Sequence, residues 1–285
     1  MGDYTIFHHI PWSGAYAIYF FTIGISAALF FFSALSWFRE AFEVLRAKAA
    51  YVSFALLVVS GALLIGDLSQ PMRFLNTLNP TYLNFASPLA WGGLNLVSFG
   101  IVSVLYLFMM KKGNEPVAKT LAVLGALLAL GLPVYTGFDL TVHQNRPVWN
   151  TPLMPVLFVA LSLVSGAAVA SFLAGGESRL VGVLRQFMLW GAGGVAVMLV
   201  SLLGTTSYGG VGQELTFMIL TTGSLSAAFL WLGVILGTAV PIAVLLAPFG
   251  RQSSGVMLSA LLILVGGMAL RYSILVGGQI VQTYF

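Results

Sequence analysis

The feature that most constrains this chain is a series of eight long apolar runs separated by short polar segments. A helix needs about 20 consecutive apolar residues to cross a bilayer, and hydrocarbon satisfies no backbone group, so each run predicts a membrane-spanning helix rather than a strand. The runs are Gly14–Ser36, Ala50–Gly66, Pro88–Met110, Val117–Phe138, Leu153–Ala174, Leu184–Thr206, Leu215–Leu236 and Gly255–Val276.

The composition agrees with a chain that is embedded in a lipid bilayer. Only 7% of the 285 residues are charged, against about 25% in soluble domains. We therefore expect an all-α integral membrane protein with eight transmembrane helices. Residues 1–285 would form a single membrane domain, with helices 1–4 at about 14–138 and helices 5–8 at about 153–276.

The basic residues predict the orientation, because Lys and Arg accumulate in cytoplasmic loops. Nine of the twelve fall between helices 1–2, 3–4, 5–6 and 7–8, and three fall on the other side. Both termini would then face the periplasm, and the chain would lie in the inner (cytoplasmic) membrane. With so few basic residues, we read this positive charge as a topology signal rather than a nucleic-acid site.

Polar groups that can carry protons are expected at the outer ends of the helices. Asp67 and Asp139 stand where apolar runs end, and His143 follows in the loop after helix 4. A carboxylate at this depth is costly unless it is paired, so it indicates either a functional site or a salt bridge to Arg73, Arg146 or Arg271.

Several side chains near the same ends are suited to hold a polar ring. Tyr135 lies one turn before Asp139, and positions i and i+4 share a helix face. Tyr16 and Tyr19 begin helix 1, and Arg271 lies near the outer end of helix 8. The alternatives are interfacial tyrosines and an arginine that reaches the headgroups. Trp12, Trp91 and Trp149 are expected to be interfacial anchors.

Some cofactors are made improbable by the residues that are missing. The chain has no cysteine, which removes thiolate-bound metals and cysteine-ligated iron–sulfur clusters. No histidine lies inside the eight runs, so a haem with histidine ligands is not expected. No metal-binding, nucleotide-binding or nucleophile motif is present either.

Taken in order, the motifs resemble those of the NrfD/PsrC family, the polysulfide reductase-type membrane subunits of molybdopterin oxidoreductase complexes. The resemblance covers nearly the whole chain. Its motifs are Trp12…Tyr16…Tyr19…Gly24, the block Gly66–Phe74, Ser87-Pro88…Trp91-Gly92, Tyr135-Thr136-Gly137-Phe138, Arg146-Pro147-Val148-Trp149-Asn150 with Pro155, and Arg271…Gly277-Gly278-Gln279.

The resemblance implies two four-helix bundles without haem, binding menaquinone or ubiquinone near the outer face. It implies a periplasmic partner with four iron–sulfur clusters and a catalytic subunit with a molybdenum or tungsten bis-pterin. The family's Tyr-x-Gly quinone ligand corresponds to Tyr135, and the aspartate of the Gly66–Phe74 block to Asp67. Where the family has Asn and His ligands on helix 1, this chain has Tyr16 and Tyr19, so the local ligand set differs.

The resulting hypothesis is quinol oxidation, or its reverse, at the outer surface. Tyr135, Tyr16, Tyr19 and Arg271 would contact the quinone, and Asp67, Asp139 and His143 would transfer protons. The alternative is a small secondary transporter or ion channel, which typically has broken helices and an ionisable group near the membrane centre. Helix 7 contains Thr221, Thr222, Gly223 and Ser224, but no charged residue is expected near any midplane. A purely structural anchor is the third possibility.

Overall fold

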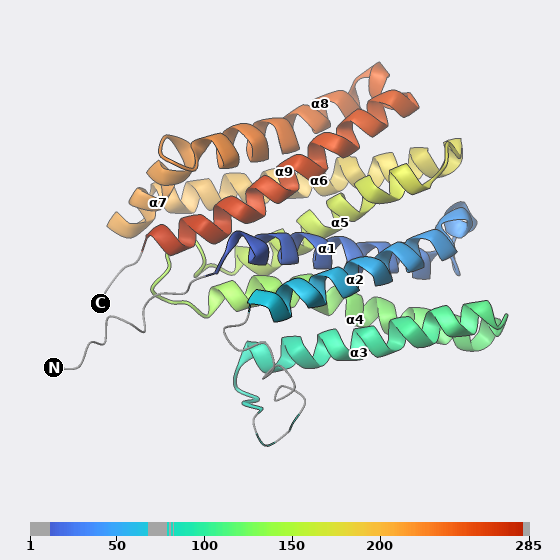
Figure 1. Cartoon of the computed structure of the whole chain (residues 1–285). Coiled ribbons are helices and arrows are strands. Elements are labelled where there is room, and N and C mark those ends of the chain that lie inside the picture. Colours follow the sequence, from blue (N-terminus) through green and yellow to red (C-terminus); the bar gives the residue numbers. More distant parts are fainter. Residues whose placement is uncertain (1–11, 68–78, 80, 82, 282–285) are drawn as a thin grey trace.

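The computed structural model describes residues 12–67, 79, 81 and 83–281, and within these ranges every regular element is a helix (Figure 1). Eight helices are long and apolar enough to cross a membrane. The elements are α1 (Gly14–Leu35), the 3₁₀-helix η2 (Glu40–Leu45), α2 (Arg46–Asp67), α3 (Pro88–Lys111), α4 (Glu115–Thr141), α5 (Leu153–Leu173), α6 (Ser178–Ser207), α7 (Val211–Thr221), the π-helix η5 (Ala227–Ala239), α8 (Val240–Leu246), the 3₁₀-helix η6 (Pro248–Arg251) and α9 (Ser253–Ile280).

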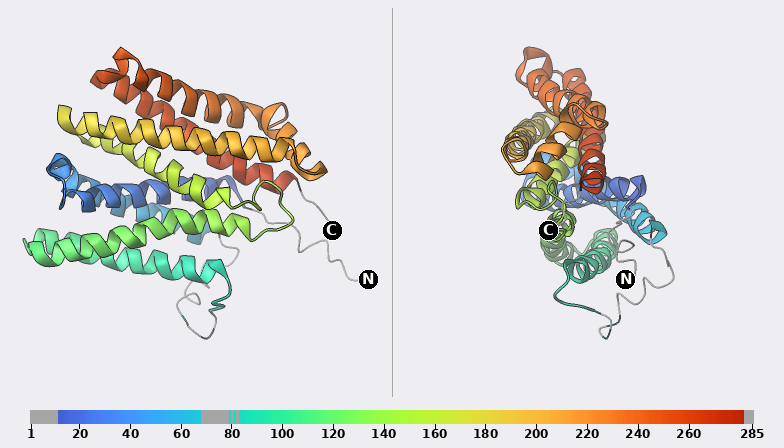
Figure 2. Two further views of the ribbon diagram at one scale, coloured as in Figure 1. Left: turned by 180° about the vertical axis from the view of Figure 1, so that it is seen from behind. Right: turned by 90° about the vertical axis from the view of Figure 1, so that its left-hand side faces the viewer.

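The long helices run up and down along one common direction, so the bundle has two ends (Figures 1 and 2). We call the end where α1 begins and α9 ends the terminal end. The opposite end, where α2 begins and α3 ends, is the basic end, because Arg46, Lys48, Lys111 and Lys112 lie there. The multi-pass architecture predicted from the apolar runs is confirmed.

Helix α1 lies at the centre of the molecule. It packs against α2 and α4 and also against α5 and α9 in the second half of the chain. Small residues allow these close approaches, as is usual in lipid. A side chain at Gly166 of α5 would collide with Ala28 of α1, and the backbones of Gly237 and Gly266 meet between η5 and α9. Residues on α1 therefore face both halves of the protein.

The seventh span differs from the sequence prediction. It was expected at Leu215–Leu236, but the spanning segment is Ala227–Leu246. The cause is the polar, glycine-containing stretch 221–224, where the Gly223 N–H bonds back to the Met218 carbonyl at 2.8 Å and ends α7. Hydropathy does not register this stop, because apolar residues continue on both sides. The other seven spans overlap their predicted runs.

Candidate functional site

A buried phenol–carboxylate pair joins α1 and α4 near the terminal end. Tyr16 Oη donates a hydrogen bond to Asp139 Oδ2 at 2.9 Å. Both side chains are 6% exposed. A carboxylate in such a place requires a hydrogen-bond donor, because burial without one is costly. Tyr16 supplies that donor from the neighbouring helix.

Two further tyrosines surround the same carboxylate. Asp139 interacts electrostatically with Tyr19 of α1 and with Tyr135 of its own helix. The rings of Tyr16 and Tyr19 lie 5.4 Å apart between centroids. Three phenols, all identified as candidates from the sequence, thus gather around Asp139. His143, one turn beyond Asp139, interacts with it as well.

Tyr135 connects this buried cluster with a lipid-facing groove between α3 and α4. The groove has a volume of about 450 Å³, and Gly92, Asn95 and Tyr135 contribute to its lining. Its rim includes Trp91 and Phe138, which are 59% and 49% exposed. The Tyr135 hydroxyl makes no hydrogen bond to another described residue. The tyrosine therefore presents a hydroxyl donor at a groove on the outer surface of α3 and α4.

Glycine at position 92 is required for this arrangement. A Cβ atom at Gly92 would overlap the Tyr135 ring, whereas one at the adjacent Gly93 would meet nothing within 4 Å. The tyrosine ring thus lies directly on the backbone of α3. This contact fixes the ring between the groove and the carboxylate.

Aromatic rings cover the Tyr16–Asp139 pair toward the terminal end. Trp12 stacks on Tyr16 with ring centroids 4.7 Å apart. Trp12 also lies 5.3 Å from His143 and 5.2 Å from Trp149. We call Trp12, His143 and Trp149 the aromatic roof. The sequence predicted Trp149 as an interfacial anchor, but its side chain is fully buried, so that interpretation is wrong.

The end of α9 holds this roof in place. The indole N–H of Trp149 donates to the Ile274 carbonyl at 2.8 Å, and the Gln279 amide donates to the Trp12 carbonyl at 3.1 Å. Arg146, also buried, donates to the carbonyls of Gly278 and Gln279 at 2.9 and 2.8 Å. Sequence reasoning did not include these positioning residues among the candidates, although all belong to the motifs that carry the family resemblance.

Asp67 lies at the rim of the cluster, not within it. Its Oδ1 accepts a hydrogen bond from Ser13 Oγ at 2.6 Å. Ser13 is the N-cap of α1, and its Oγ accepts from the Ala15 N–H. The carboxylate thus ties the end of α2 to the start of α1. Among the described residues it forms no ion pair with Arg146 or Arg271. Arg73 lies outside the described residues.

Arg271 is fully buried and lies deeper than the tyrosines. It donates to the Gly267 carbonyl at 3.1 Å and to Ser162 Oγ at 3.2 Å, and it faces the ring of Phe21. Nine residues separate it from the end of α9, roughly 14 Å along the helix axis. Its side chain is enclosed by protein within the candidate spanning helix α9 and does not extend outward, as the headgroup alternative would require. None of its polar contacts is with the Tyr16–Asp139 pair.

Comparison with known proteins places the whole chain in one group of sequences. The family model described as "Polysulphide reductase, NrfD" matches residues 5–282. The C subunit of polysulfide reductase from Wolinella succinogenes is 31% identical, over 98% of this chain and 97% of its own. Protein NrfD of Escherichia coli is 28% identical, with 96% of both chains covered. An Hdr-like menaquinol oxidoreductase integral membrane subunit of Archaeoglobus fulgidus is 22% identical, over 98% of this chain and 74% of its own.

Proposed function

Because this chain belongs to the NrfD family of polysulphide reductase-type membrane proteins, we propose that it is the quinone-reactive membrane subunit of a respiratory oxidoreductase. Its relatives are named as subunits of reductases acting on polysulfide and tetrathionate. One relative is named as a menaquinol oxidoreductase subunit. The chain would have no activity by itself and would serve a complex.

The observation that carries this proposal is the position of Tyr135. Its ring lies between a lipid-facing groove and a buried carboxylate that is already bonded to Tyr16. Menaquinone and ubiquinone dissolve in the bilayer and would reach the groove from the side. The free Tyr135 hydroxyl fits a quinone oxygen, since it has no hydrogen bond within the described chain.

A bound quinone would supply the redox chemistry, in which two electrons and two protons are transferred. The chain's own residues would bind its oxygens and move the protons. Tyr135 would donate to one oxygen, and Tyr16 or Tyr19 of α1 would serve the other. Asp139 would accept a proton through Tyr16, and His143, in the partly exposed roof, would pass it to water at the terminal end.

Two of the candidates fit the proposal less directly. Asp67 would act at the rim as a second proton acceptor, because it is bonded to Ser13, three residues before Tyr16. Arg271 contacts none of the three tyrosines, so its part in quinone binding would be to place positive charge below the ring site. The alternative role of Asp67 is structural, because its hydrogen bond to Ser13 connects the end of α2 to the start of α1.

The partners are proposed from the resemblance to the NrfD/PsrC family. Electrons would leave through a docked subunit with four iron–sulfur clusters, and a chain without cysteine is consistent with clusters held by a partner. That subunit would serve a molybdenum or tungsten bis-pterin subunit. The aromatic roof would lie between the quinone and the partner. The basic end would face the cytoplasm because of its excess of Lys and Arg, and the partners would then dock on the periplasmic side of the inner membrane.

The alternative of a small transporter or channel gains support from two observations. Arg271 is fully buried within the spanning helix α9, and helix 7 is interrupted before its spanning segment. Both features occur in transporters. The two functions differ in a simple way, because a transporter would carry out its activity without iron-containing partners.

The proposal is tested by gentle purification of the chain with its co-purifying proteins. We expect iron, acid-labile sulfide and molybdenum or tungsten in the partners, no haem absorption bands, and oxidation of menaquinol by the complex. A metal-free protein that purifies alone and neither binds nor oxidises quinol would contradict the proposal. The transporter would then be the leading function.

A further inference from the structure

The contact between α1 and α2 carries a polar residue every seven positions. On α2 these residues are Asp67, Ser60, Ser53 and Arg46. Seven residues make about two helical turns, so all four lie on one face. Each bonds to a residue of α1, and we call this row of paired groups the hydroxyl seam.

The seam spans most of the bundle. At the terminal end Ser13 Oγ donates to Asp67 at 2.6 Å. Deeper, the hydroxyls of Thr22 and Ser60 lie 2.8 Å apart. Near the centre, Ser26 and Ser53 exchange hydrogen bonds with each other's carbonyls at 2.8 and 2.7 Å.

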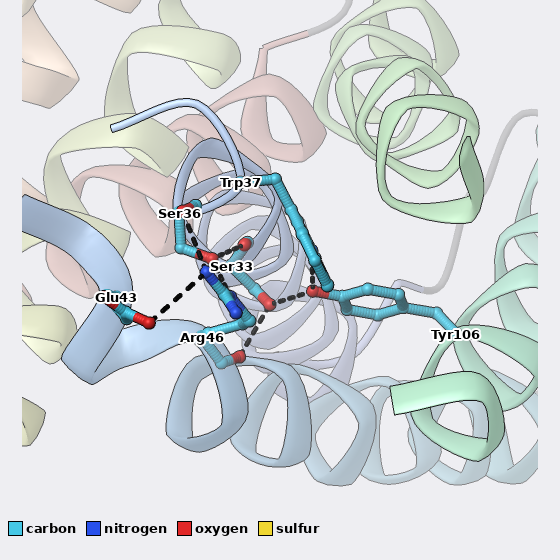
Figure 3. Close-up of polar contacts among 6 residues, drawn as sticks. All are labelled: Ser33, Ser36, Trp37, Glu43, Arg46 and Tyr106. Carbon is cyan, nitrogen blue, oxygen red and sulfur yellow. Dashed lines mark hydrogen bonds and ion pairs between the residues drawn. The ribbon is translucent and has the colours of Figure 1, made fainter. Parts of the chain in front are cut away.

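At the basic end the seam joins a polar network (Figure 3). Ser33 Oγ donates to the Arg46 carbonyl at 2.7 Å and lies 2.9 Å from Tyr106 Oη. Trp37 donates to the same phenol at 3.0 Å. Arg46 bonds to Ser36 Oγ and lies 3.9 Å from Glu43. The network thus links a fully buried phenol with a carboxylate at the protein surface.

This network opens into a pocket of about 340 Å³ at the basic end, lined in part by Trp37, Arg46, Glu43 and Glu115. Carboxylates at the mouth of a buried polar chain provide groups that exchange protons with water. At its other end the seam comes within one helical turn of the candidate site, since Thr22 bonds to the backbone carbonyl of Tyr19 at 3.2 Å. The Tyr19 ring lies 5.4 Å from the ring of Tyr16, which donates to Asp139.

The longest interruption within the buried part of the seam lies between Ser26 and Ser33, about 10 Å along α1. Phe30 occupies this level on α1, and its ring packs against Phe99 and Tyr106 of α3. Ser103, between these two residues on the same face of α3, is 1% exposed, and its hydroxyl has no hydrogen-bond partner among the described residues. A buried hydroxyl without a partner is costly and is typically satisfied by an internal water molecule.

We propose that the hydroxyl seam conducts protons between the basic-end pocket and the quinone site, with water bound at Ser103. This inference rests on the proposed quinone function. Within each pair a hydroxyl oxygen accepts one proton and releases its own. The backbone carbonyls to which these hydroxyls also bond cannot relay a proton, so conduction requires water between the pairs. Oxidation of one quinol releases two electrons to the partner subunit and two protons, and a share of these protons leaves along the seam.

The competing explanation is packing, because paired Ser and Thr residues also hold membrane helices together. Packing accounts for Ser26, Ser53, Thr22 and Ser60, whose hydroxyls are all bonded. Paired packing does not account for Ser103, whose hydroxyl bonds to no other residue in the described part of the chain. Ser103→Ala is therefore a clean variant, since it removes a hydroxyl without breaking a hydrogen bond. Ser165→Ala is its matched control, because Ser165 is equally buried and unpartnered but lies on α5, away from the seam.

The test uses the intact complex in liposomes, oriented with the basic end inward, with a pH-sensitive dye trapped in the lumen. Menaquinol is added with the impermeant oxidant ferricyanide, and protein-free liposomes give the background. We expect luminal acidification during quinol oxidation, loss of most of it in Ser103→Ala, and none of this loss in Ser165→Ala. Acidification confined to the outer medium, or an unchanged luminal signal in Ser103→Ala, overturns the inference.

A second measurement applies even if the complex oxidises no quinol. An imposed pH gradient, with valinomycin and potassium to compensate charge, drives protons through the same chain. The seam predicts a slower response of the luminal dye in Ser103→Ala than in wild type or Ser165→Ala. Equal rates in all three contradict it. Quinol oxidation without a proton signal would refute the seam alone, whereas absent oxidation would refute the proposed function.

Discussion

Tyr16 and Asp139, 123 residues apart in the chain, form a buried hydrogen bond of 2.9 Å between α1 and α4. The bond places a proton donor beside a carboxylate, one helical turn from Tyr135, which lines the groove between α3 and α4. Loss of a partner from such a pair leaves a buried group unsatisfied, at a cost of about 1–3 kcal/mol.

Substitution of Gly92 tests the position of the Tyr135 ring separately from the chemistry of the Tyr135 hydroxyl. Gly92→Ala introduces a Cβ into the Tyr135 ring and displaces it, although Tyr135 itself is unchanged. Because misplacement of a reacting group by about 1 Å can lower a rate by roughly 100-fold, we expect a large fall in quinol oxidation. Gly93→Ala is the control, since open space surrounds that position. Equal rates in the two variants, measured with menaquinol, would contradict the assigned place of Tyr135.

The two aspartates are expected to differ. Asp139→Asn retains the shape of the side chain but removes the buried proton acceptor, so quinol oxidation should fall by roughly 100-fold or more. Asp67→Asn keeps an acceptor for Ser13 and lies at the rim, where water can replace it, so the fall should be much smaller. Turnover of the intact complex measures both. A greater loss in Asp67→Asn would move the proton acceptor from Asp139 to the rim.

The aromatic roof depends on a glycine of α9. A Cβ at Gly278 would overlap the indole of Trp149, which is bonded to Ile274. Gly278→Ala should therefore destabilise the protein by about 1–3 kcal/mol and lower its thermal unfolding midpoint in detergent. Gly66→Ala, where an added Cβ meets no described residue within 4 Å, should leave the midpoint unchanged. An unaltered midpoint in Gly278→Ala would mean that the roof is loosely packed.

Much of this structure could be predicted from the apolar runs. The lengths of the apolar runs predicted seven of the eight spans, and the spacing of four residues predicted that Tyr135 and Asp139 share one face of a helix. The proximity of Tyr16 to Asp139 could not be derived, because it depends on how α1 packs against α4. The start of the seventh span was misplaced since hydropathy does not register the hydrogen-bonded stop at Gly223. The depth of Arg271 was underestimated because α9 continues to Ile280, beyond the predicted run.

The central claim, quinone binding by Tyr135, is tested most directly by menaquinol oxidation in Tyr135→Phe. The substitution keeps the ring on Gly92 and removes only a hydroxyl that bonds to no described residue, so folding should be retained. Tyr272→Phe, at a partly exposed position on α9, is the control. We predict that turnover falls by roughly 100-fold in Tyr135→Phe and is unchanged in Tyr272→Phe. Wild-type turnover in Tyr135→Phe would contradict the assignment of the quinone site.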